Sequence, residues 1–330
     1  MSTVKDSKRI IKWAVIVAGV LAVFYMLFFR CQVSDRQAIL TAQQFMQKHD
    51  IRINAAPSFS DLNYIGFLMS GLLCEKKKKT LTFGDDFTYS PLISIDCDSG
   101  EVIMYKNHAI LQNLAKKYQR ITPKVGSSYT DWPAFMSEND ARRVADSIAM
   151  KIPLPADMSF EGLKKYMRGA DHDKDGLWIA TWRRSLNGYS YEFDRVTIGI
   201  VGFSGQFVQY EKIYEGTKCS TGVKISREKA TEIGWDKLKE KIDKERRAQT
   251  RDAYDITSVK LLIVRPNVLF GCSVPYRSRT SRLAWVIKFG IKDGPEVWKY
   301  MKMPPMDYEV RVDAFDGRYL GGTEDIFLQK

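Results

Sequence analysis

The chain has 330 residues, of which 45% are hydrophobic and 27% charged, with a formal net charge of +12. This composition excludes wholesale disorder, and the length suits two or three domains of common size. The positive charge favours anionic partners.

The first feature in chain order is an uncharged apolar segment from Trp13 to Phe29. Extended to residues 10–30, it is long enough for one transmembrane helix at about 1.5 Å per residue. Lysine and arginine are concentrated before it, so the positive-inside rule places residues 1–9 in the cytoplasm and the rest outside, anchored in the cell membrane. A cleaved signal peptide or a lipoprotein modified at Cys31 is the alternative, but bulky residues stand where small ones are required.

This orientation restricts the partners of a basic chain. Outside the cytoplasm the chain would meet anionic lipid head groups, anionic wall or envelope polymers, or acidic protein surfaces. We expect no nucleic acid there. The densest cationic run, Lys76–Lys79, is most simply interpreted as a solvated loop.

Further along, one short pattern occurs three times: SDRQA at Ser34, SENDA at Ser137 and SREKA at Ser226. Apolar residues with helical spacing follow each copy. Serine is a good N-cap because its hydroxyl accepts a hydrogen bond from a free amide of the first turn. We therefore expect a helix to begin after each serine.

Each predicted helix is followed by alternating, strand-like sequence that closes in the same way. The closing segments are Leu92–Tyr105, Val196–Tyr210 and Tyr308–Gly322. Each contains two short strands around a turn that ends in glycine, at Gly100, Gly205 and Gly317. Glycine supplies the positive φ that such turns require. Further strand candidates are Leu177–Arg184, Tyr189–Phe193, Val259–Val264 and Leu283–Phe289.

Together these patterns predict the α+β class, with an N-terminal transmembrane helix followed by tandem units. Each unit has one helix packed on an antiparallel sheet of about three or four strands. The predicted organisation is a cytoplasmic N-terminus at residues 1–9, the transmembrane helix at residues 10–30, and units at residues 34–120, 133–216 and 223–330.

The third unit has the most specific set of motifs. Its helix begins with Ile225–Ala230, which reads ISREKA and follows an I-S-x-E-x-A pattern. A strand at Trp285–Ile287 follows, and then Tyr308–Asp313 with Gly317 and Leu320. These motifs, in this order, resemble a PepSY domain.

The second unit resembles the PepSY-like units that occur in tandem in bacterial envelope proteins and in propeptides of thermolysin-type peptidases. It has Trp182–Arg184, Asn187–Tyr189 and a strand from Val196. Gly199 and Gly202 replace the bulkier residues and the aspartate of that pattern. In the first unit the resemblance depends on SDRQA and SIDCDSGEV alone.

This resemblance implies modules that inhibit or assist secreted peptidases, or that serve as membrane-anchored regulators outside the cytoplasm. It implies no catalytic residues and no cofactor, so we expect no enzyme. We predict a binding or regulatory protein whose partner is a peptidase or another envelope protein. The alternative is an envelope structural or sensing protein whose basic surface binds anionic polymer or lipid.

One local motif indicates a metal. Asp171, Asp173 and Asp175 alternate and are followed by Gly176, like the opening of a calcium-binding loop. Trp182 stands where such a loop has its last acidic ligand. An acidic turn is therefore the alternative to a calcium site.

The five cysteines have no CxxC spacing, which argues against zinc. In an oxidising compartment four of them could form two disulfides. Chain order favours pairs within one stretch, Cys74 with Cys97 and Cys219 with Cys272, although buried free cysteines are common.

The remaining motifs do not indicate catalysis. None of the three histidines is in an HExxH pattern, and the sequence lacks the nucleophile elbow, the P-loop and the dinucleotide-binding glycines. A sheet of the predicted type leaves edges to which an extended partner segment could add.

Overall fold

The computed structural model describes the chain in separate stretches. They are residues 31–53, 55–59, 78–84, 90–107, 134–166, 176–215, 217–244, 253–266, 280–292 and 306–326, with residues 19, 109, 110 and 113. The predicted transmembrane segment lies outside these stretches except for Gly19. Within them, no helix is long and apolar enough to cross a membrane.

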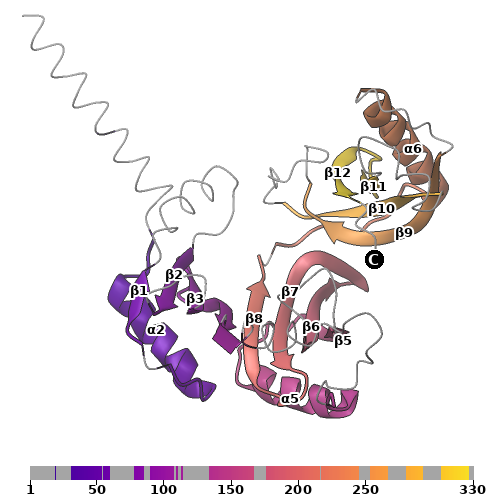
Figure 1. The fold of residues 1–330 in the computed structure, drawn as a ribbon. Coiled ribbons are helices and arrows are strands. Elements are labelled where there is room, and N and C mark those ends of the chain that lie inside the picture. The colour runs from indigo at the N-terminus through magenta and orange to yellow at the C-terminus, as the bar shows by residue number, and fades with distance from the viewer. Residues whose placement is uncertain are drawn as a thin grey trace, which may run out of the picture. The chain divides into compact units, whose positions relative to one another are not determined.

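The described residues have a mixed α+β fold, as predicted (Figure 1). The helices are α2 (Asp35–Lys48), α5 (Glu138–Met150) and α6 (Arg227–Lys244). The strands are β1 (Pro57–Phe59), β2 (Lys78–Phe83), β3 (Pro91–Asp96), β4 (Val102–Asn107), β5 (Met158–Tyr166), β6 (Leu177–Leu186), β7 (Tyr189–Val201), β8 (Phe207–Ile213), β9 (Tyr254–Val264), β10 (Arg282–Ile291), β11 (Met306–Asp313) and β12 (Tyr319–Ile326).

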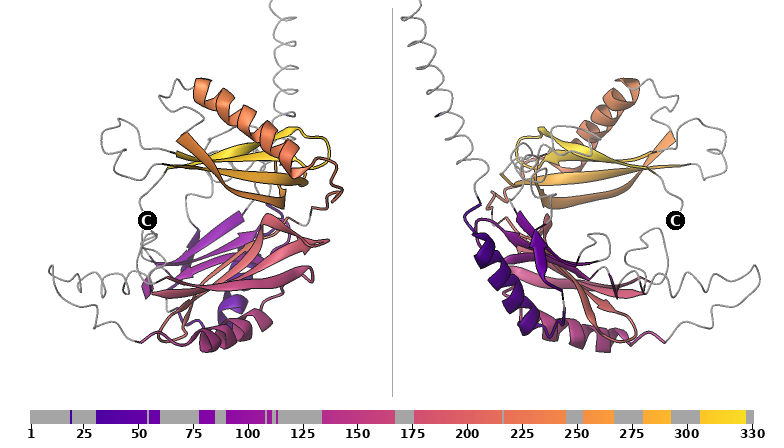
Figure 2. Two further views of the ribbon diagram at one scale, coloured as in Figure 1. Left: turned by 90° about the vertical axis from the view of Figure 1, so that its right-hand side faces the viewer. Right: turned by 60° about the vertical axis from the view of Figure 1, so that its left-hand side comes forward.

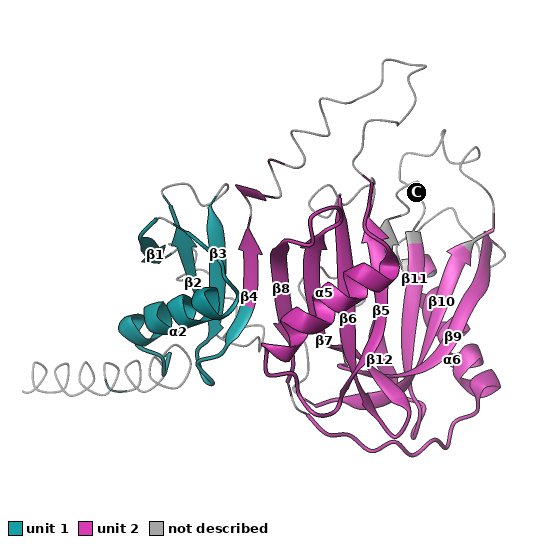
Figure 3. Ribbon diagram, turned by 90° about the horizontal axis from the view of Figure 1, so that it is seen from below, with its two compact units in different colours: residues 1–103 teal, residues 104–330 magenta. Residues whose placement is uncertain are grey.

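The chain divides into two units, residues 1–103 and residues 104–330 (Figure 3). In the first unit, β2 pairs with β1 on one side and with β3 on the other, both antiparallel. Helix α2 packs against β2 and β3. Residues 104–107 of β4 belong to the second unit, where residues 104–106 pair with β8.

The second unit contains two similar blocks. The α5 block consists of α5 and the antiparallel strands β5 to β8, and the α6 block consists of α6 and the antiparallel strands β9 to β12. Each helix lies across one face of its own strands (Figures 1 and 2). The blocks meet where β7 and β9 run parallel, with Tyr191 opposite Ile263.

All three predicted N-cap serines are confirmed. The hydroxyls of Ser34, Ser137 and Ser226 accept a hydrogen bond from the backbone N–H three residues later, at 3.2, 3.1 and 3.2 Å. The alanine that ends each sequence pattern lies one turn into the helix on the side facing the sheet, and it is fully buried. These alanines are Ala38, Ala141 and Ala230.

The three predicted glycine turns are also confirmed, and they share one hydrogen-bond pattern. In each turn the glycine N–H donates to the carbonyl oxygen four residues earlier, at 2.9 to 3.0 Å. The φ angles are +73°, +70° and +75° at Gly100, Gly205 and Gly317. Side chains other than glycine rarely adopt this conformation, which explains the recurrence of glycine here.

The residue before each N-cap serine packs against the glycine turn of the same predicted unit. Side-chain carbons of Val33, Met136 and Ile225 lie 3.7, 3.2 and 3.5 Å from where a Cβ on the turn glycine would be. Backbone amides of the same segments donate to the turns at 2.7 to 3.1 Å. The two sequence patterns that mark each predicted unit therefore meet in space.

The second turn differs from the other two in one side chain. Asp96 and Asp313 each accept hydrogen bonds from two backbone amides of their own turn. The hydrogen-bond pattern places Val201 at the equivalent position. The sequence pattern predicts Gly202 at the position of the missing aspartate. The structure places that position one residue earlier, at Val201.

Helix α6 is held on its sheet by a continuous apolar core. Ala230, Leu238 and Ile242 pack on Phe289 of β10 and Tyr308 of β11, and all of these side chains are buried. Because apolar surface removed from water contributes about 25 cal/mol per Å², this packing stabilises the α6 block.

Candidate functional site

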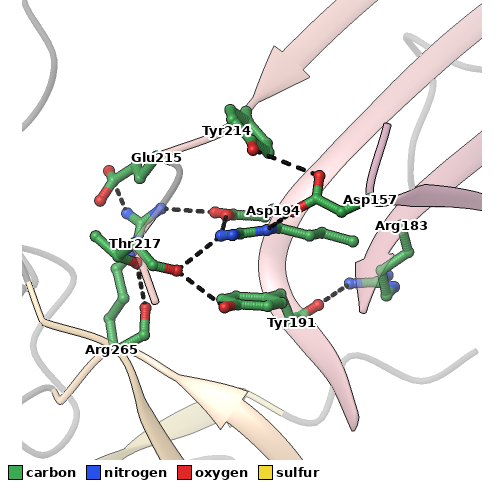
Figure 4. A network of polar contacts seen from close by, with 10 residues as sticks. Asp157, Arg183, Tyr191, Asp194, Tyr214, Glu215, Thr217 and Arg265 are labelled. Carbon is green, nitrogen blue, oxygen red and sulfur yellow. Dashed lines mark hydrogen bonds and ion pairs between the residues drawn. The ribbon is translucent and has the colours of Figure 1, made fainter. Parts of the chain in front are cut away.

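A buried polar cluster surrounds Arg184 of β6. Figure 4 labels residues of this cluster, among them Asp157, Asp194 and Thr217. Its Nε donates to Asp157 Oδ2 at 2.6 Å, and its Nη1 donates to Asp194 Oδ2 at 3.0 Å and to the Thr217 carbonyl at 2.8 Å. The guanidinium lies 4.1 Å from the ring centre of Tyr191. The side chain of Arg184 is only 5% exposed.

A second arginine reaches the same carboxylate from the other block. Arg265, at the end of β9, places Nη2 3.3 Å from Asp194 Oδ1 and Nη1 2.6 Å from Glu215 Oε1. Asp194 itself is on β7 and its side chain is 2% exposed. It therefore bridges the α5 block and the α6 block through two cations. We call Arg184, Asp194 and Arg265 the arginine joint.

The surroundings keep the arginine charged and the nearby phenol neutral. Burial by itself lowers the pKa of Arg184, but hydrogen bonds to Asp157 and Asp194 offset it, and the net pKa is raised. Burial also raises the pKa of Tyr191, although Arg184 opposes this. The Tyr191 hydroxyl therefore keeps its proton and donates a hydrogen bond to the Thr217 carbonyl at 2.9 Å.

A further ion pair crosses between the same two blocks. Arg311 of β11 donates to Glu192 of β7 at 2.6 Å and to Glu309 at 2.9 Å. The Arg311 side chain is 3% exposed. Beside these charges lies an apolar cluster of Tyr191, Ile263, Leu283 and Ala314. Polar and apolar contacts together hold the blocks in one orientation.

The chemistry of the arginine joint is that of a structural contact. Each cation is used by carboxylates of the chain itself, and a buried charge that is fully paired is costly to disturb. In the sequence, Arg184 belongs to the Trp182–Arg184 motif of the second unit, and no pattern there predicts this cluster. Spacing along the chain contains no signal for it, because Asp194 and Arg265 are brought together by the packing of two blocks.

A different surface has charges that the described residues do not neutralise. Strand β5 pairs with β6 on one side only within the described stretches. Lys164 and Lys165 on it are exposed. Their Nζ atoms lie near aromatic rings: Lys164 is 4.8 Å from the Tyr166 ring centre, and Lys165 is 4.3 Å from that of Phe135. We call residues 158–166 the β5 edge.

The predicted calcium ligands Asp171, Asp173 and Asp175 lie outside the described residues, in the segment after β5. Calcium binding there stays a prediction. Within the described stretches, histidine, cysteine and acidic side chains form no group of three or more that could hold a metal ion.

The cysteines differ from the predicted pairing. Cys97 forms a disulfide with Cys31, not with Cys74. The reason is that the segment before α2 lies on the closing turn of the first unit, where the Gln32 amide donates to the Cys97 carbonyl at 3.1 Å.

The second predicted pair, Cys219 with Cys272, is not formed in this structure. Cys219 has a free thiol, and burial raises its pKa. Its predicted partner Cys272 lies outside the described residues, as does Cys74.

The comparisons with known proteins leave the family open. No family model and no curated protein matches this chain. Among solved structures, the chain is similar to the C-terminal domain of YpeB from Bacillus megaterium, with 14% identity over 91% of this chain and 100% of that domain. The TM-score of 0.40 is too low for this similarity to support a functional argument.

Proposed function

We propose that this chain is a membrane-anchored, extracytoplasmic binding and regulatory protein built from PepSY-like units, and that its partner is a protein such as a secreted or membrane peptidase. The units would present a binding surface and would perform no chemistry of their own. The long strand β5, open along one side in the described residues, is the observation that supports this role most directly.

The disulfide supports the proposed compartment. Cys31 and Cys97 are 66 positions apart and are joined in the first unit. Disulfides persist mainly in oxidising compartments and are rare in the cytoplasm. This fits an orientation in which residues 10–30 form the anchor and everything after them is outside.

Photo-crosslinking from the full chain in intact cells tests the binding role. A photoreactive residue at Ser159 or Lys164 of the β5 edge, both exposed, should yield a discrete protein adduct that mass spectrometry identifies. Lys239, exposed on α6, provides the matched control position. If no position on the chain yields a protein adduct, the proposed function is wrong.

The second candidate is binding to anionic polymer or lipid. The observation that favours it is the net charge of +12 together with the exposed lysines of the β5 edge. Binding of the full chain to anionic liposomes or to wall polymer should then weaken steeply with salt, because exposed charges are screened within about 8 Å at physiological ionic strength. Indifference to salt would exclude this candidate.

A further inference from the structure

We propose that the β5 edge binds an extended, acidic segment of a protein partner as an added β-strand. This inference deepens the proposed function and rests on it, since it specifies the chemistry of the partner and the surface that receives it.

The backbone of β5 provides the first reason. The strand has nine residues and pairs antiparallel with β6 from Met158 opposite Arg184 to Tyr166 opposite Leu177. In an edge strand, alternate residues direct their N–H and C=O groups away from the sheet. Such a row is a template for a further strand, and β5 is far longer than β1, the three-residue strand at the edge of the first unit.

The charges of β5 provide the second reason. Glu161 is paired with Arg183 at 2.7 Å, so the acidic side chain of the strand is already neutralised. Lys164 and Lys165 have aromatic neighbours and, within the described residues, no carboxylate partner. The edge therefore presents net positive charge beside the rings of Tyr166, Phe135 and Trp178.

These charges also select among possible occupants. A second copy of β5 would bring two more lysines to the same edge, and like charges close together on paired strands are destabilising. Edge lysines commonly protect a sheet from pairing with itself in this way. An acidic strand from a different protein would instead gain both backbone hydrogen bonds and opposite charges.

The surroundings of β5 are built to hold the strand in place. The ring of Phe160 packs edge-on against Trp182 of β6 with centroids 5.5 Å apart, and the Arg142 guanidinium of α5 lies 3.2 Å from the Phe160 ring centre. A β-bulge between Phe160 and Gly162 separates this anchored half from the half that carries the lysines. A partner strand would thus meet an ordered template and lose little free energy in ordering it.

The test measures peptide binding to the full chain in uncharged detergent by fluorescence anisotropy. The probe is a peptide as long as β5, nine residues, that alternates glutamate and threonine. The comparison peptides are its lysine–threonine counterpart and the same acidic peptide with alternate amides N-methylated. N-methylation removes hydrogen-bond donors and leaves the charge unchanged, so it separates strand addition from simple electrostatic attraction.

We expect the acidic peptide to bind, and the N-methylated and basic peptides to bind at least about tenfold more weakly. The variant Lys164→Glu/Lys165→Glu should weaken binding of the acidic peptide about tenfold, the change expected when two exposed charge attractions become repulsions. The control Lys239→Glu/Lys260→Glu makes the same charge change at exposed positions of α6 and the internal strand β9, and it should bind like the unmodified chain.

Equal binding of the N-methylated peptide, or equal loss in both double variants, would overturn strand addition at β5. So would lysine-dependent binding to anionic liposomes without binding of the acidic peptide, which would assign the edge to lipid. Crosslinking in cells to a protein through another surface would leave the proposed function standing while this inference fails. Conversely, peptide binding without any protein adduct in cells would leave strand addition at β5 standing, while the proposed function and with it the protein partner would fail.

Discussion

At the residue scale, the buried charges of the arginine joint are paired with one another. Asp194 is 2% exposed and contacts both Arg184 and Arg265. Transfer of an isolated charge out of water costs several kcal/mol, and the cost is recovered only when geometry and hydrogen bonds are good. The three side chains therefore depend on one another.

We predict that Asp194→Asn lowers the free energy of unfolding by about 3 kcal/mol, because two buried arginines lose their shared carboxylate. Urea denaturation of the full chain measures this. The control is Glu232→Gln, which removes an exposed pair with Lys229 and should leave the free energy of unfolding unchanged. If Asp194→Asn leaves the free energy of unfolding as unchanged as the control does, the arginine joint contributes no stability.

Because Tyr105 of β4 is buried, we predict that the chain loses folding stability at alkaline pH. The pKa of Tyr105 is raised from 10.0 to about 12, chiefly by burial, while the hydrogen bond from Asn107 opposes the shift. The unfolded phenol loses its proton from about pH 10 and the folded phenol only near pH 12, so stability falls as pH rises between these values. The shift corresponds to a loss of about 3 kcal/mol.

The substitution Tyr105→Phe isolates this contribution. The variant should show a shallower loss of stability between pH 10 and 12, and its absorbance at 295 nm should lack one tyrosine that ionises late. The decline should not vanish, since burial also raises the pKa of Tyr191 and Tyr214. An unchanged decline in the variant would mean that Tyr105 is not the group responsible.

At the element scale, each helix is started by a serine and positioned by a glycine turn. For α5, the Ser137 hydroxyl accepts from the Asp140 amide and donates to its carboxylate at 2.7 Å. This bond and the Arg143 guanidinium lower the pKa of Asp140. The cap thus satisfies a backbone donor that the helix itself leaves free.

We predict that Ser137→Ala destabilises the chain by about 1 kcal/mol through loss of this N-cap. The matched control is Ser147→Ala in the same helix, where the exposed hydroxyl bonds only to the Val144 carbonyl one turn earlier. Alanine favours the helix interior, so this control should be neutral or slightly stabilising. Chemical denaturation of both variants tests whether position, rather than residue type, determines the effect.

The disulfide also stabilises one element against another. It joins the segment before α2 to the closing turn of the first unit. For a loop of 66 positions the chain-entropy model gives a stabilisation of about 4 kcal/mol. We expect Cys31→Ser/Cys97→Ser to make residues 31–103 much more sensitive to protease. Cys219→Ala, which removes a free thiol, should leave that region as resistant as before.

Peptide mapping without reductant checks the pairing itself. It should yield one peptide that joins Cys31 and Cys97 and separates on reduction. A map in which Cys97 is joined to Cys74 would restore the pairing expected from chain order.

At the scale of the whole molecule, the second unit is held together by contacts between its two blocks. Arg265 and Arg311 come from the α6 block, while Asp194 and Glu192 come from the α5 block. The shared apolar cluster around Tyr191 and Ile263 lies next to them. A rigid arrangement of this kind would keep the β5 edge at a fixed distance from the rest of the unit.

We predict that Arg265→Met destabilises the α6 block and leaves the stability of the α5 block unchanged. Arg184 still pairs with Asp194 in this variant, so the α5 block should keep its slow hydrogen exchange while β9 and β10 lose about 1 to 2 kcal/mol of protection. Arg318→Met, which removes an exposed pair with Asp316, provides the control. Equal losses in both blocks would show that they unfold as one body.

Short patterns in the sequence were sufficient to predict the local features. The serine caps, the glycine turns and the α+β class follow from hydrogen bonds and φ angles within a few residues, so short patterns predict them. Strand β5 was not predicted, because its two adjacent lysines and its bulge interrupt the alternation expected of a strand. Strand β7 was expected as two separate pieces and forms one long strand, Tyr189–Val201.

The contacts between residues far apart in the sequence come from the packing of the elements. Cys97 lies close to Cys31 because the segment before α2 packs on a turn more than sixty residues later. Asp194 meets Arg265 because β7 and β9 run side by side, and among the described strands β5 is an edge because β6 alone pairs with it. Contacts of this kind depend on how elements pack, and spacing along the chain does not encode them.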